Sequence, residues 1–387
     1  MVKRSIPVIH HWLRTVALVA LCGVTVGYLL TTSAAPVAFA PRDGIDKNGA
    51  VVLRRPDSRT VAPDSHANSY GFSANEVVWM DAGRRAQQLD AMKAAGVTWV
   101  RIDMQWYTVQ PSNANSYDWS VYDRAIDAIN QHGLKTLAIL DYAPAWAATN
   151  GCRPNISHKC APADPQAFAT YAAAAASRYT ARGVTSWEIW NEQNSPRFWY
   201  PTVDATAYAN LLKATYPAIK KVNPTATVIT GGLKSADAED DINPADYMLA
   251  VYNAGGQPYF DALAAHPYTY PDLPSQPTRS NGWMQMLQIY DVAVSQGDAT
   301  KQIWMTEVGA TTGGPHPVSD NLQAQIVDDA IRLHNSYSWA GPLFWYDYQD
   351  LGTNPAKGED FYGLVRANGS RKPAYTSFIL ALRRLET

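Results

Sequence analysis

The sequence predicts an α/β fold, namely a closed (β/α)8 TIM barrel, and two observations support this prediction. From residue 66 onward, short apolar runs rich in β-branched and aromatic residues alternate with longer segments of helical periodicity, which is typical of successive βα units around a parallel sheet. Eight such units follow one another, the number that closes a barrel. A doubly wound open sheet is the alternative, but no G-x-G-x-x-G turn follows the first strand, so a dinucleotide site has no support.

Each expected strand is a short apolar run bounded by turn residues. In chain order the strands are Tyr70–Ser73, Trp99–Asp103, Thr136–Leu140, Ser186–Trp190, Thr227–Thr230, Ala262–Ala265, Ile303–Thr306 and Leu343–Tyr346. The helices expected between and after them are Ala82–Ala95, Trp119–Gln131, Pro165–Ala181, Ala205–Val222, Ala245–Asn253, Gly282–Ser295, Asp320–Ser336 and Pro373–Leu385. Boundary residues support several of these helices, since Gly133 and Gly183 lie just past helix ends and Pro373 opens the last helix.

The composition is that of a folded globular protein, because 47% of the 387 residues are hydrophobic and 17% are charged. The formal net charge of −2 gives no basic field that would attract nucleic acid, so no nucleic-acid partner is expected. The 13 Trp and 22 Tyr exceed what a core of this size needs. Some of these flat side chains are therefore expected to face a ligand.

The N-terminal segment, residues 1–40, has the layout of a signal peptide, with basic residues before the apolar run Thr15–Leu30 and the small-residue sequence Ala38-Phe39-Ala40 at its end. An uncleaved membrane anchor is the alternative, because Pro41 follows the candidate cleavage site. In both cases we expect a secreted or cell-surface protein whose membrane association, if any, is through this segment only. Residues 41–65 are expected to be a linker, and residues 66–387 a single folded domain.

Two cysteines of the folded domain, Cys152 and Cys160, lie in a loop rich in proline. In an oxidising compartment they are expected to form a disulfide, and two free thiols are the alternative.

Two glutamates stand at the ends of expected strands. Asn191 and Glu192 end the fourth strand in WEIWNE, and Glu307 ends the seventh in IWMTEV. In a (β/α)8 barrel the C-terminal ends of the strands converge on one mouth, so these side chains are expected to meet there. The alternative is that either Glu caps a helix or pairs with a surface Arg.

Two carboxylates across a cleft lined by aromatic side chains suit hydrolysis of a glycosidic bond, in which one group protonates the leaving oxygen and the other attacks or activates water. The sequence has no H-E-x-x-H, G-x-S-x-G or P-loop motif and no Cys/His cluster with metal-ligand spacing. No metal and no cofactor are therefore expected.

The chain resembles the clan A retaining glycoside hydrolases, and within them family 39 and the related family 5, the cellulase-type (β/α)8 proteins. Asn191-Glu192 is similar to the acid/base pair that ends the fourth strand in this clan, and Glu307 to the nucleophile that ends the seventh. His266-Pro267-Tyr268 resembles the position beside the nucleophile, and Trp345 resembles the eighth-strand Trp that floors the sugar site. These families usually show Asn-Glu-Pro where this chain has Gln193 after Glu192, which leaves the exact family and substrate open.

The resemblance implies a general acid/base role for Glu192, a contact of Asn191 with the sugar 2-hydroxyl and a nucleophilic role for Glu307. Tyr268 and other donors at the mouth can keep Glu307 ionised. Arg101 is expected either to donate toward Glu307 or to form a buried structural pair with Glu188. Further aromatic residues are expected to bind sugar at the mouth, with core packing as the alternative: Trp106, Tyr142, Trp146, Trp199, Tyr200, Tyr270 and Tyr346.

We therefore expect residues 66–387 to be the catalytic domain of a monomeric retaining glycoside hydrolase that acts on an oligosaccharide or polysaccharide outside the cell. Two alternatives use the same fold: a transglycosylase, and a carbohydrate-binding barrel with an inactive site. The sequence does not distinguish hydrolysis from transglycosylation, because both use the same residues.

Overall fold

The computed structural model of the protein describes residues 69–149, 152, 158–236 and 238–385. The predicted signal segment, the linker and the first residues of the predicted domain lie outside the described residues. Within the described residues, no helix is both long enough and apolar enough to cross a membrane.

The strands form one parallel sheet in the order β5-β4-β3-β2-β1-β9-β8-β7-β6. All pairings between these strands are parallel. Their bounds are β1 (Tyr70–Ser73), β2 (Trp99–Gln105), β3 (Lys135–Asp141), β4 (Ser186–Ile189), β5 (Thr227–Thr230), β6 (Leu233–Lys234), β7 (Leu263–His266), β8 (Ile303–Val308) and β9 (Ala340–Trp345).

The sheet closes into a barrel between β5 and β7. A parallel bridge joins Ile229 to Ala262, and the amide of Thr230 donates to the Ala262 carbonyl at 3.1 Å. The short β6 continues the fifth barrel strand after Gly231-Gly232 and also pairs with β7. The nine segments therefore serve as eight barrel strands, and the predicted (β/α)8 fold is confirmed.

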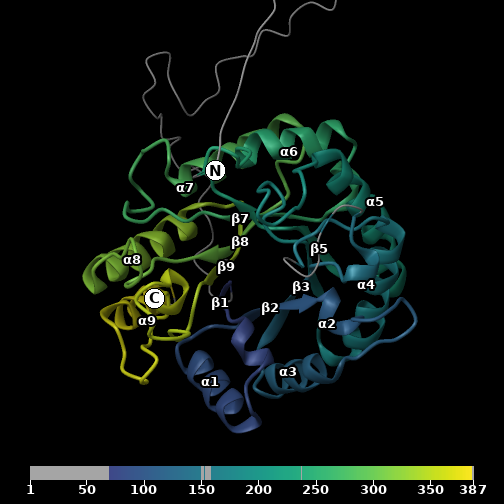
Figure 1. Cartoon of the computed structure of the whole chain (residues 1–387). Coiled ribbons are helices and arrows are strands. Elements are labelled where there is room, and N and C mark those ends of the chain that lie inside the picture. The colour runs from purple at the N-terminus through teal and green to yellow at the C-terminus, as the bar shows by residue number, and fades with distance from the viewer. Residues whose placement is uncertain (1–68, 150–151, 153–157, 237, 386–387) are drawn as a thin grey trace, which may run out of the picture. The chain divides into compact units, whose positions relative to one another are not determined.

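Helices surround the barrel strands, as Figure 1 shows. The α-helices are α1 (Ala82–Ala94), α2 (Trp106–Val109), α3 (Ser120–Gln131), α4 (Pro165–Tyr179), α5 (Ala205–Val222), α6 (Pro244–Asn253), α7 (Gly282–Ser295), α8 (Asp320–Ser336) and α9 (Pro373–Arg383). The 3-10 helices are η1 (Asn75–Val78), η2 (Ala145–Ala147), η3 (Thr180–Arg182), η4 (Gln257–Tyr259) and η5 (Gly358–Phe361). The sequence predicted the eight longer α-helices; α2, the 3-10 helices and β6 were not expected, because single turns carry too little periodicity.

Two separate clusters of buried apolar side chains hold the fold together. The smaller one fills the barrel interior, where Trp99, Trp304 and Phe344 meet edge to face at ring distances of 5.5 and 6.3 Å. The larger one lies between the sheet and the helices and includes Phe72, which stacks on Phe378 of α9. Since neighbouring residues of a strand face opposite sides, β2, β3, β5, β7, β8 and β9 each contribute residues to both clusters.

The helices begin at the end of the barrel where the strands finish, and side chains mark those starts. Asp81, Asp204 and Asn281 accept hydrogen bonds from the first amides of α1, α5 and α7. The loops that join strands to helices therefore gather at this face. One of them, after β3, contains the expected disulfide between Cys152 and Cys160, whose Cα atoms are 6.1 Å apart.

Candidate active site

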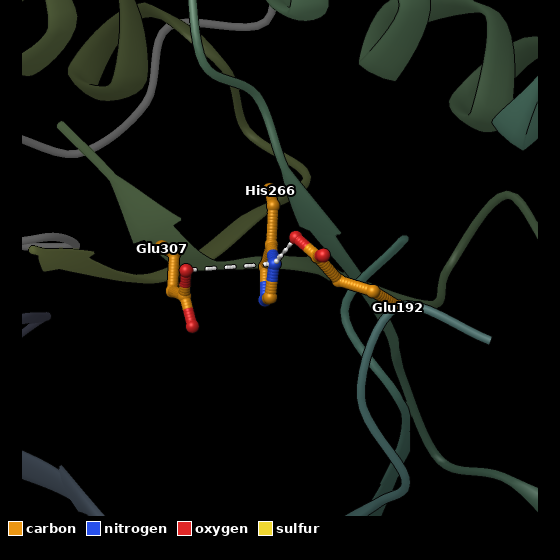
Figure 2. Close-up of side chains that lie close together, drawn as sticks. All are labelled: Glu192, His266 and Glu307. Atoms are coloured by element: carbon orange, nitrogen blue, oxygen red, sulfur yellow. Dashed lines mark hydrogen bonds and ion pairs between the residues drawn. The ribbon is translucent and has the colours of Figure 1, made fainter. Parts of the chain in front are cut away.

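The two predicted glutamates meet at the mouth of the barrel. Glu192 follows β4, and Glu307 lies near the end of β8. A carboxylate oxygen of each and a ring nitrogen of His266 all lie within 4.8 Å of one another. Figure 2 shows the imidazole between the two carboxylates. Residues 115 positions apart in sequence are thus brought together by the convergence of strand ends, as the sequence predicted.

Arg101 of β2 lies at the centre of the polar contacts. Its side chain is 1% exposed. Nε donates to Glu188 at 2.7 Å and Nη1 donates to Glu307 at 2.6 Å, so both predicted partners of this arginine are present. The guanidinium also donates to Ser73 at 3.0 Å and to Asn191 at 3.1 Å. One cation on β2 therefore fixes groups that arrive from β1, β4 and β8.

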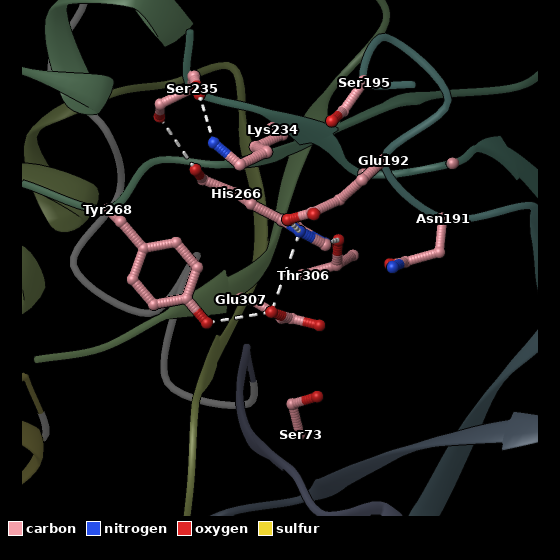
Figure 3. A network of polar contacts seen from close by, with 12 residues as sticks. Ser73, Asn191, Glu192, Ser195, Lys234, Ser235, His266, Tyr268, Thr306 and Glu307 are labelled. Atoms are coloured by element: carbon pink, nitrogen blue, oxygen red, sulfur yellow. Dashed lines mark hydrogen bonds and ion pairs between the residues drawn. The ribbon is translucent and has the colours of Figure 1, made fainter. Parts of the chain in front are cut away.

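Glu307 is held in its ionised form. Arg101 donates to Oε1, and the hydroxyl of Tyr268 donates to Oε2 at 2.8 Å, as Figure 3 shows for Tyr268. Burial alone would raise the pKa of Glu307, but the charges of His266 and Arg101 and the two hydrogen bonds outweigh burial and lower the pKa below its ordinary value. Glu307 is thus an ionised carboxylate with one donor on each oxygen.

His266 connects the two glutamates. Nδ1 lies 2.9 Å from Glu192 Oε1 and 3.7 Å from Glu307 Oε2, and Nε2 lies 3.1 Å from the hydroxyl oxygen of Thr306. Burial would lower the pKa of His266, but the negative charge of Glu307 and the contact with Glu192 raise it above the ordinary value. A proton on Nδ1 therefore points at Oε1 of Glu192, which leaves the other oxygen of Glu192 for a substrate.

A glycine provides the room for this imidazole. A Cβ atom at Gly232 would lie 2.1 Å from His266 Nε2 and 2.6 Å from the Thr306 hydroxyl, so no larger residue fits there. The amide of Gly232 also donates to Glu188 at 2.8 Å. Because β5 ends before Gly231-Gly232, the backbone amide of Gly232 is free to bond to Glu188 among the polar side chains of the site.

Asn191 is positioned from two sides, by Arg101 and by the hydroxyl of Tyr142, which accepts from Nδ2 at 3.1 Å. Tyr142, Trp190 and Glu192 all have left-handed backbone, with φ angles of 56°, 71° and 49°. Such angles cost energy in non-glycine residues and cluster at functional sites. The backbone around Asn191 and Glu192 is therefore strained in the way expected of a built site.

Three of the predicted sugar-binding aromatics are instead core residues. Trp106 is fully buried and stacks on Tyr171 at 5.6 Å. Trp199 is 2% exposed and packs between Trp190 and Tyr208. Trp345 is 1% exposed and pairs in register with Phe72, whose ring faces the helices. Because paired residues of parallel strands face the same side, Trp345 points away from the barrel mouth, and its predicted role as the floor of the site is wrong.

Tyrosines near Glu307 take the place expected of Trp345. Tyr346, the next residue along, is half-buried and packs against Tyr362 at 5.2 Å. Tyr362 in turn contacts Tyr268 and Tyr270, and its hydroxyl lies 2.5 Å from that of Tyr270. Burial and the charges of Asp347 and Glu307 raise the pKa of Tyr346, so its phenol stays protonated. Tyr362 comes from a loop after β9 that no sequence motif marks.

Trp146 keeps part of its surface at the mouth. It is half-buried in η2, packs edgewise on Trp106 at 5.3 Å and donates from Nε1 to the Gln110 carbonyl at 2.8 Å. The side chain is thus fixed while its outer part stays accessible, which fits the predicted binding role.

Sequence reasoning missed three charged residues beside the site. Asp103 and Asp141 lie near the ends of β2 and β3. Burial raises the pKa of Asp103 to about 6, while burial and the charge of Asp103 raise the pKa of Asp141 well above its usual range. Burial lowers the pKa of Lys159, although the charges of Glu192 and both aspartates oppose that effect. Asp103 lies two residues after Arg101 on β2, so the alternation of side chains along a strand could have predicted that both face the barrel interior.

Glu192, His266 and Glu307 also have a spacing that could hold a metal ion. In Glu307, however, each oxygen already accepts a hydrogen bond, from Arg101 and Tyr268. A carboxylate whose two oxygens both accept hydrogen bonds, as those of Glu307 do, is better suited to act as an ionised nucleophile than as a metal ligand.

Comparison with known families identifies one match that covers most of the chain. The model of the cellulase family, glycosyl hydrolase family 5, matches residues 61–345. This range contains every predicted catalytic and sugar-binding residue except Tyr346, which directly follows it.

Solved structures of glycoside hydrolases share the fold. A family 39 glycoside hydrolase from the gut symbiont Bacteroides cellulosilyticus WH2 is 26% identical with a TM-score of 0.67, over 82% of this chain and 64% of that one. GH5_18 from Streptomyces cattleya, solved in complex with GlcNAc, is 18% identical with a TM-score of 0.62, over 83% of this chain and 80% of that one.

A shorter likeness links the chain to a β-amylase from Cytobacillus firmus, which is 31% identical over 103 residues. The matched segment is 27% of this chain and spans only a fifth, 20%, of the β-amylase.

Replacing Glu188 with Gln is expected to destabilise the protein by about 3–5 kcal/mol, because it leaves the buried Arg101 cation without its closest anion besides Glu307. Urea unfolding monitored by circular dichroism measures the change. Asp328→Asn, which breaks an exposed pair with Arg384, is the control and should cost no more than about 1 kcal/mol. Equal, small losses for both variants would show that Arg101 does not depend on Glu188.

Proposed function

Since the chain belongs to the cellulase family, glycosyl hydrolase family 5, we propose that it is a retaining glycosidase that hydrolyses O-glycosidic bonds of an extracellular or cell-wall polysaccharide by double displacement. In this proposal Glu307 is the nucleophile and Glu192 the general acid/base.

The observation that carries the proposal is the spacing of the two carboxylates. A carboxylate oxygen of Glu192 lies within 4.8 Å of one of Glu307. Retaining enzymes place their carboxyl groups about 5–5.5 Å apart, whereas inverting enzymes need roughly 6.5–9.5 Å to admit a water molecule between carboxylate and sugar. The close spacing supports direct attack by one carboxylate on the anomeric carbon.

The surroundings of the two side chains divide the roles. In the first step Glu307, ionised by its donors, attacks the anomeric carbon while Glu192 gives its proton to the departing glycosidic oxygen. A covalent ester forms at Glu307 and the glycosidic bond breaks. In the second step Glu192 takes a proton from water, whose oxygen attacks the anomeric carbon and releases Glu307.

Neighbouring side chains would hold the sugar in this site. Asn191, fixed by Arg101 and Tyr142, would contact the hydroxyl next to the anomeric carbon. Tyr346, which is half-buried against Tyr362, would pack against the sugar ring in place of Trp345. Such contacts strengthen as the ring distorts toward the transition state.

The proposal of export rests on residues 1–40 and on the Cys152–Cys160 disulfide, since disulfides persist in oxidising compartments. When the full chain is expressed in a bacterial host, activity should appear outside the cytoplasm, either in the medium or with the membrane. Deleting residues 1–40 should keep the enzyme in the cytoplasm. Cytoplasmic retention of the full chain would refute export while leaving the assigned chemistry intact.

The two glutamates should respond differently to replacement. Glu307→Gln should reduce hydrolysis to background for every substrate, because no covalent intermediate can form. Glu192→Ala should lower the rate about 10²–10⁴-fold on substrates with poor leaving groups, yet still accept an activated aryl glycoside. Azide should then speed turnover of Glu192→Ala and give a glycosyl azide of retained configuration, because azide attacks without a general base.

Glu359→Gln, which changes an exposed carboxylate in η5, is the matched control and should keep wild-type rates. If azide instead restored activity to Glu307→Ala and gave a product of inverted configuration, while Glu192→Ala stayed inactive on every substrate, the assignment of the two roles would have to be exchanged.

The pH profile should report the hydrogen bond from Tyr268 to Glu307. Tyr268→Phe removes a donor that favours the charged carboxylate, so the pKa of Glu307 should rise. Because Glu307 must be ionised to attack, the acidic limb of kcat/KM should move to higher pH while the alkaline limb stays in place. Tyr270→Phe is the control, since that hydroxyl contacts Tyr362 instead of Glu307. If the acidic limb does not move in Tyr268→Phe, Tyr268 does not help to lower the pKa of Glu307.

A further inference from the structure

Two acidic side chains that the proposed mechanism does not use meet at the mouth end of the barrel. Glu76 belongs to η1, in the loop between β1 and α1, and Asp347 lies just after β9. Because β1 and β9 pair with each other in the sheet, the segments that follow them begin side by side. The carboxyl groups of Glu76 and Asp347 lie within hydrogen-bond reach of each other.

The surroundings supply no hydrogen for this contact. Asp347 is 1% exposed, and its Oδ1 accepts from the amide of Tyr348 at 2.5 Å. Its Oδ2 is buried and has no donor among the described residues. On the other side, the amide Nε2 of Gln88 in α1 donates to Oε1 of Glu76. Neither carboxyl forms an ion pair within the part of the chain that the structure describes.

A proton on one of the two carboxyls completes the contact. Ionised carboxylates only accept hydrogen bonds, so two of them bond to each other only through a proton that one of them carries. Two negative charges side by side in a buried place are costly. Burial raises the pKa of Glu76 to about 7, and burial and the charge of Glu76 raise the pKa of Asp347 well above its ordinary value. A single shared proton therefore fits the pair in acidic and neutral solution.

The pair adjoins the tyrosine that would pack against the sugar. Tyr346 directly precedes Asp347, is half-buried and packs against Tyr362 at 5.2 Å. Besides burial, the charges of Asp347, Glu307 and Glu76 raise the pKa of Tyr346. Its phenol is thus close enough to sense both the acidic pair and the proposed nucleophile.

Other charged groups face the same region. The charge of Asp350 also raises the pKa of Asp347, and Lys372 pairs with Asp350 at 2.7 Å. Asp103 of β2 faces Tyr346 and has a pKa raised by burial to about 6. These groups stay in place when only the acidic pair is changed, so a comparison between variants isolates the shared proton from them.

We propose that Glu76 and Asp347 share one proton, which joins the loop after β1 to the segment after β9 and thereby positions Tyr346 for the sugar. When the proton leaves to water at alkaline pH, the two carboxylates repel each other, Tyr346 shifts and the sugar binds more weakly. The inference rests on the proposed function, because Tyr346 contacts a sugar only in that proposal. Glu76 and Asp347 are positioning residues, since they act through Tyr346.

The first measurement is thermal unfolding as a function of pH. The pKa of Glu76 lies above its ordinary value of 4.5, so the stability given by the shared proton is complete below that value and is lost as the pH rises through about 7. In Glu76→Gln the side-chain amide donates to Asp347 at every pH. Between about pH 5 and about pH 8, Tm should therefore fall by about 5 °C more in the wild type than in Glu76→Gln.

The second measurement tests the position of Tyr346. From about pH 6 to about pH 8, KM for an activated aryl glycoside should rise about three- to tenfold in the wild type and stay at its acidic value in Glu76→Gln. The pH dependence of kcat should be the same in both, because neither Glu192 nor Glu307 is changed. Near-ultraviolet circular dichroism of the wild type should change over the same range, and the change should be absent in Glu76→Gln and in Tyr346→Phe.

Two further variants make the comparison specific. Asp347→Asn supplies the donor from the other side and keeps an acceptor for the Tyr348 amide, so it should behave as Glu76→Gln does and decides the test if that variant fails to fold. Glu359→Gln changes an exposed glutamate of η5 and should keep the wild-type pH dependence of Tm and KM.

An equal fall of Tm with pH in the wild type, Glu76→Gln and Asp347→Asn would overturn the shared proton. A difference in Tm without a difference in KM and in circular dichroism would overturn the positioning of Tyr346. If the wild type hydrolyses no glycoside, the proposed function fails, and the comparisons of Tm and circular dichroism still decide whether the proton is shared and whether its loss moves Tyr346.

Discussion

The site depends on one buried cation. Arg101 enters the barrel from β2 with almost no exposed surface, and a charge in that position is tolerable only if anions and acceptors surround it. Its hydrogen bonds go to residues from three other barrel strands: Ser73 of β1, Glu188 of β4 with Asn191 just after it, and Glu307 of β8. Because every partner must sit within hydrogen-bond distance, the arginine sets the spacing of the strand ends. Satisfying this charge and aligning the proposed nucleophile are thus the same requirement.

The network also makes two chemically identical side chains different. Glu307 receives a full hydrogen bond on each oxygen from Arg101 and Tyr268, whereas Glu192 receives one from His266 and remains open on its other oxygen. The hydroxyl of Thr306 can accept from His266 while it donates to Glu188 at 3.0 Å, so His266 is tied back to the same anion that holds Arg101. The difference between the proposed nucleophile and the proposed proton donor therefore originates in the hydrogen-bond partners of each carboxylate.

Sequence reasoning succeeded for features that depend on hydrophobic periodicity and on where strands end. The positions of Glu192 and Glu307 followed from apolar runs that end in a carboxylate, and the structure brings them together. It failed where an aromatic residue could serve either the core or the site. Trp345 and Tyr346 are neighbours, and only the register with Phe72 shows which of them faces the helices. The register is fixed by pairing with β1, which lies far away in sequence, so the residues near the end of β9 do not by themselves show which side chain faces the helices.

The aromatic residues explain why that ambiguity is inherent to this chain. Buried rings such as Trp106 and Trp199 pack beneath the loops of the mouth and leave them little freedom, while Trp79 and Tyr200 are carried outward on backbone that Arg85 and the disulfide loop restrain. The same residue type thus serves both buried packing and the surface, and sequence alone contains no sign of which position does which. Aromatic richness in this chain therefore reflects how tightly the loops around the site are packed as much as what those loops expose.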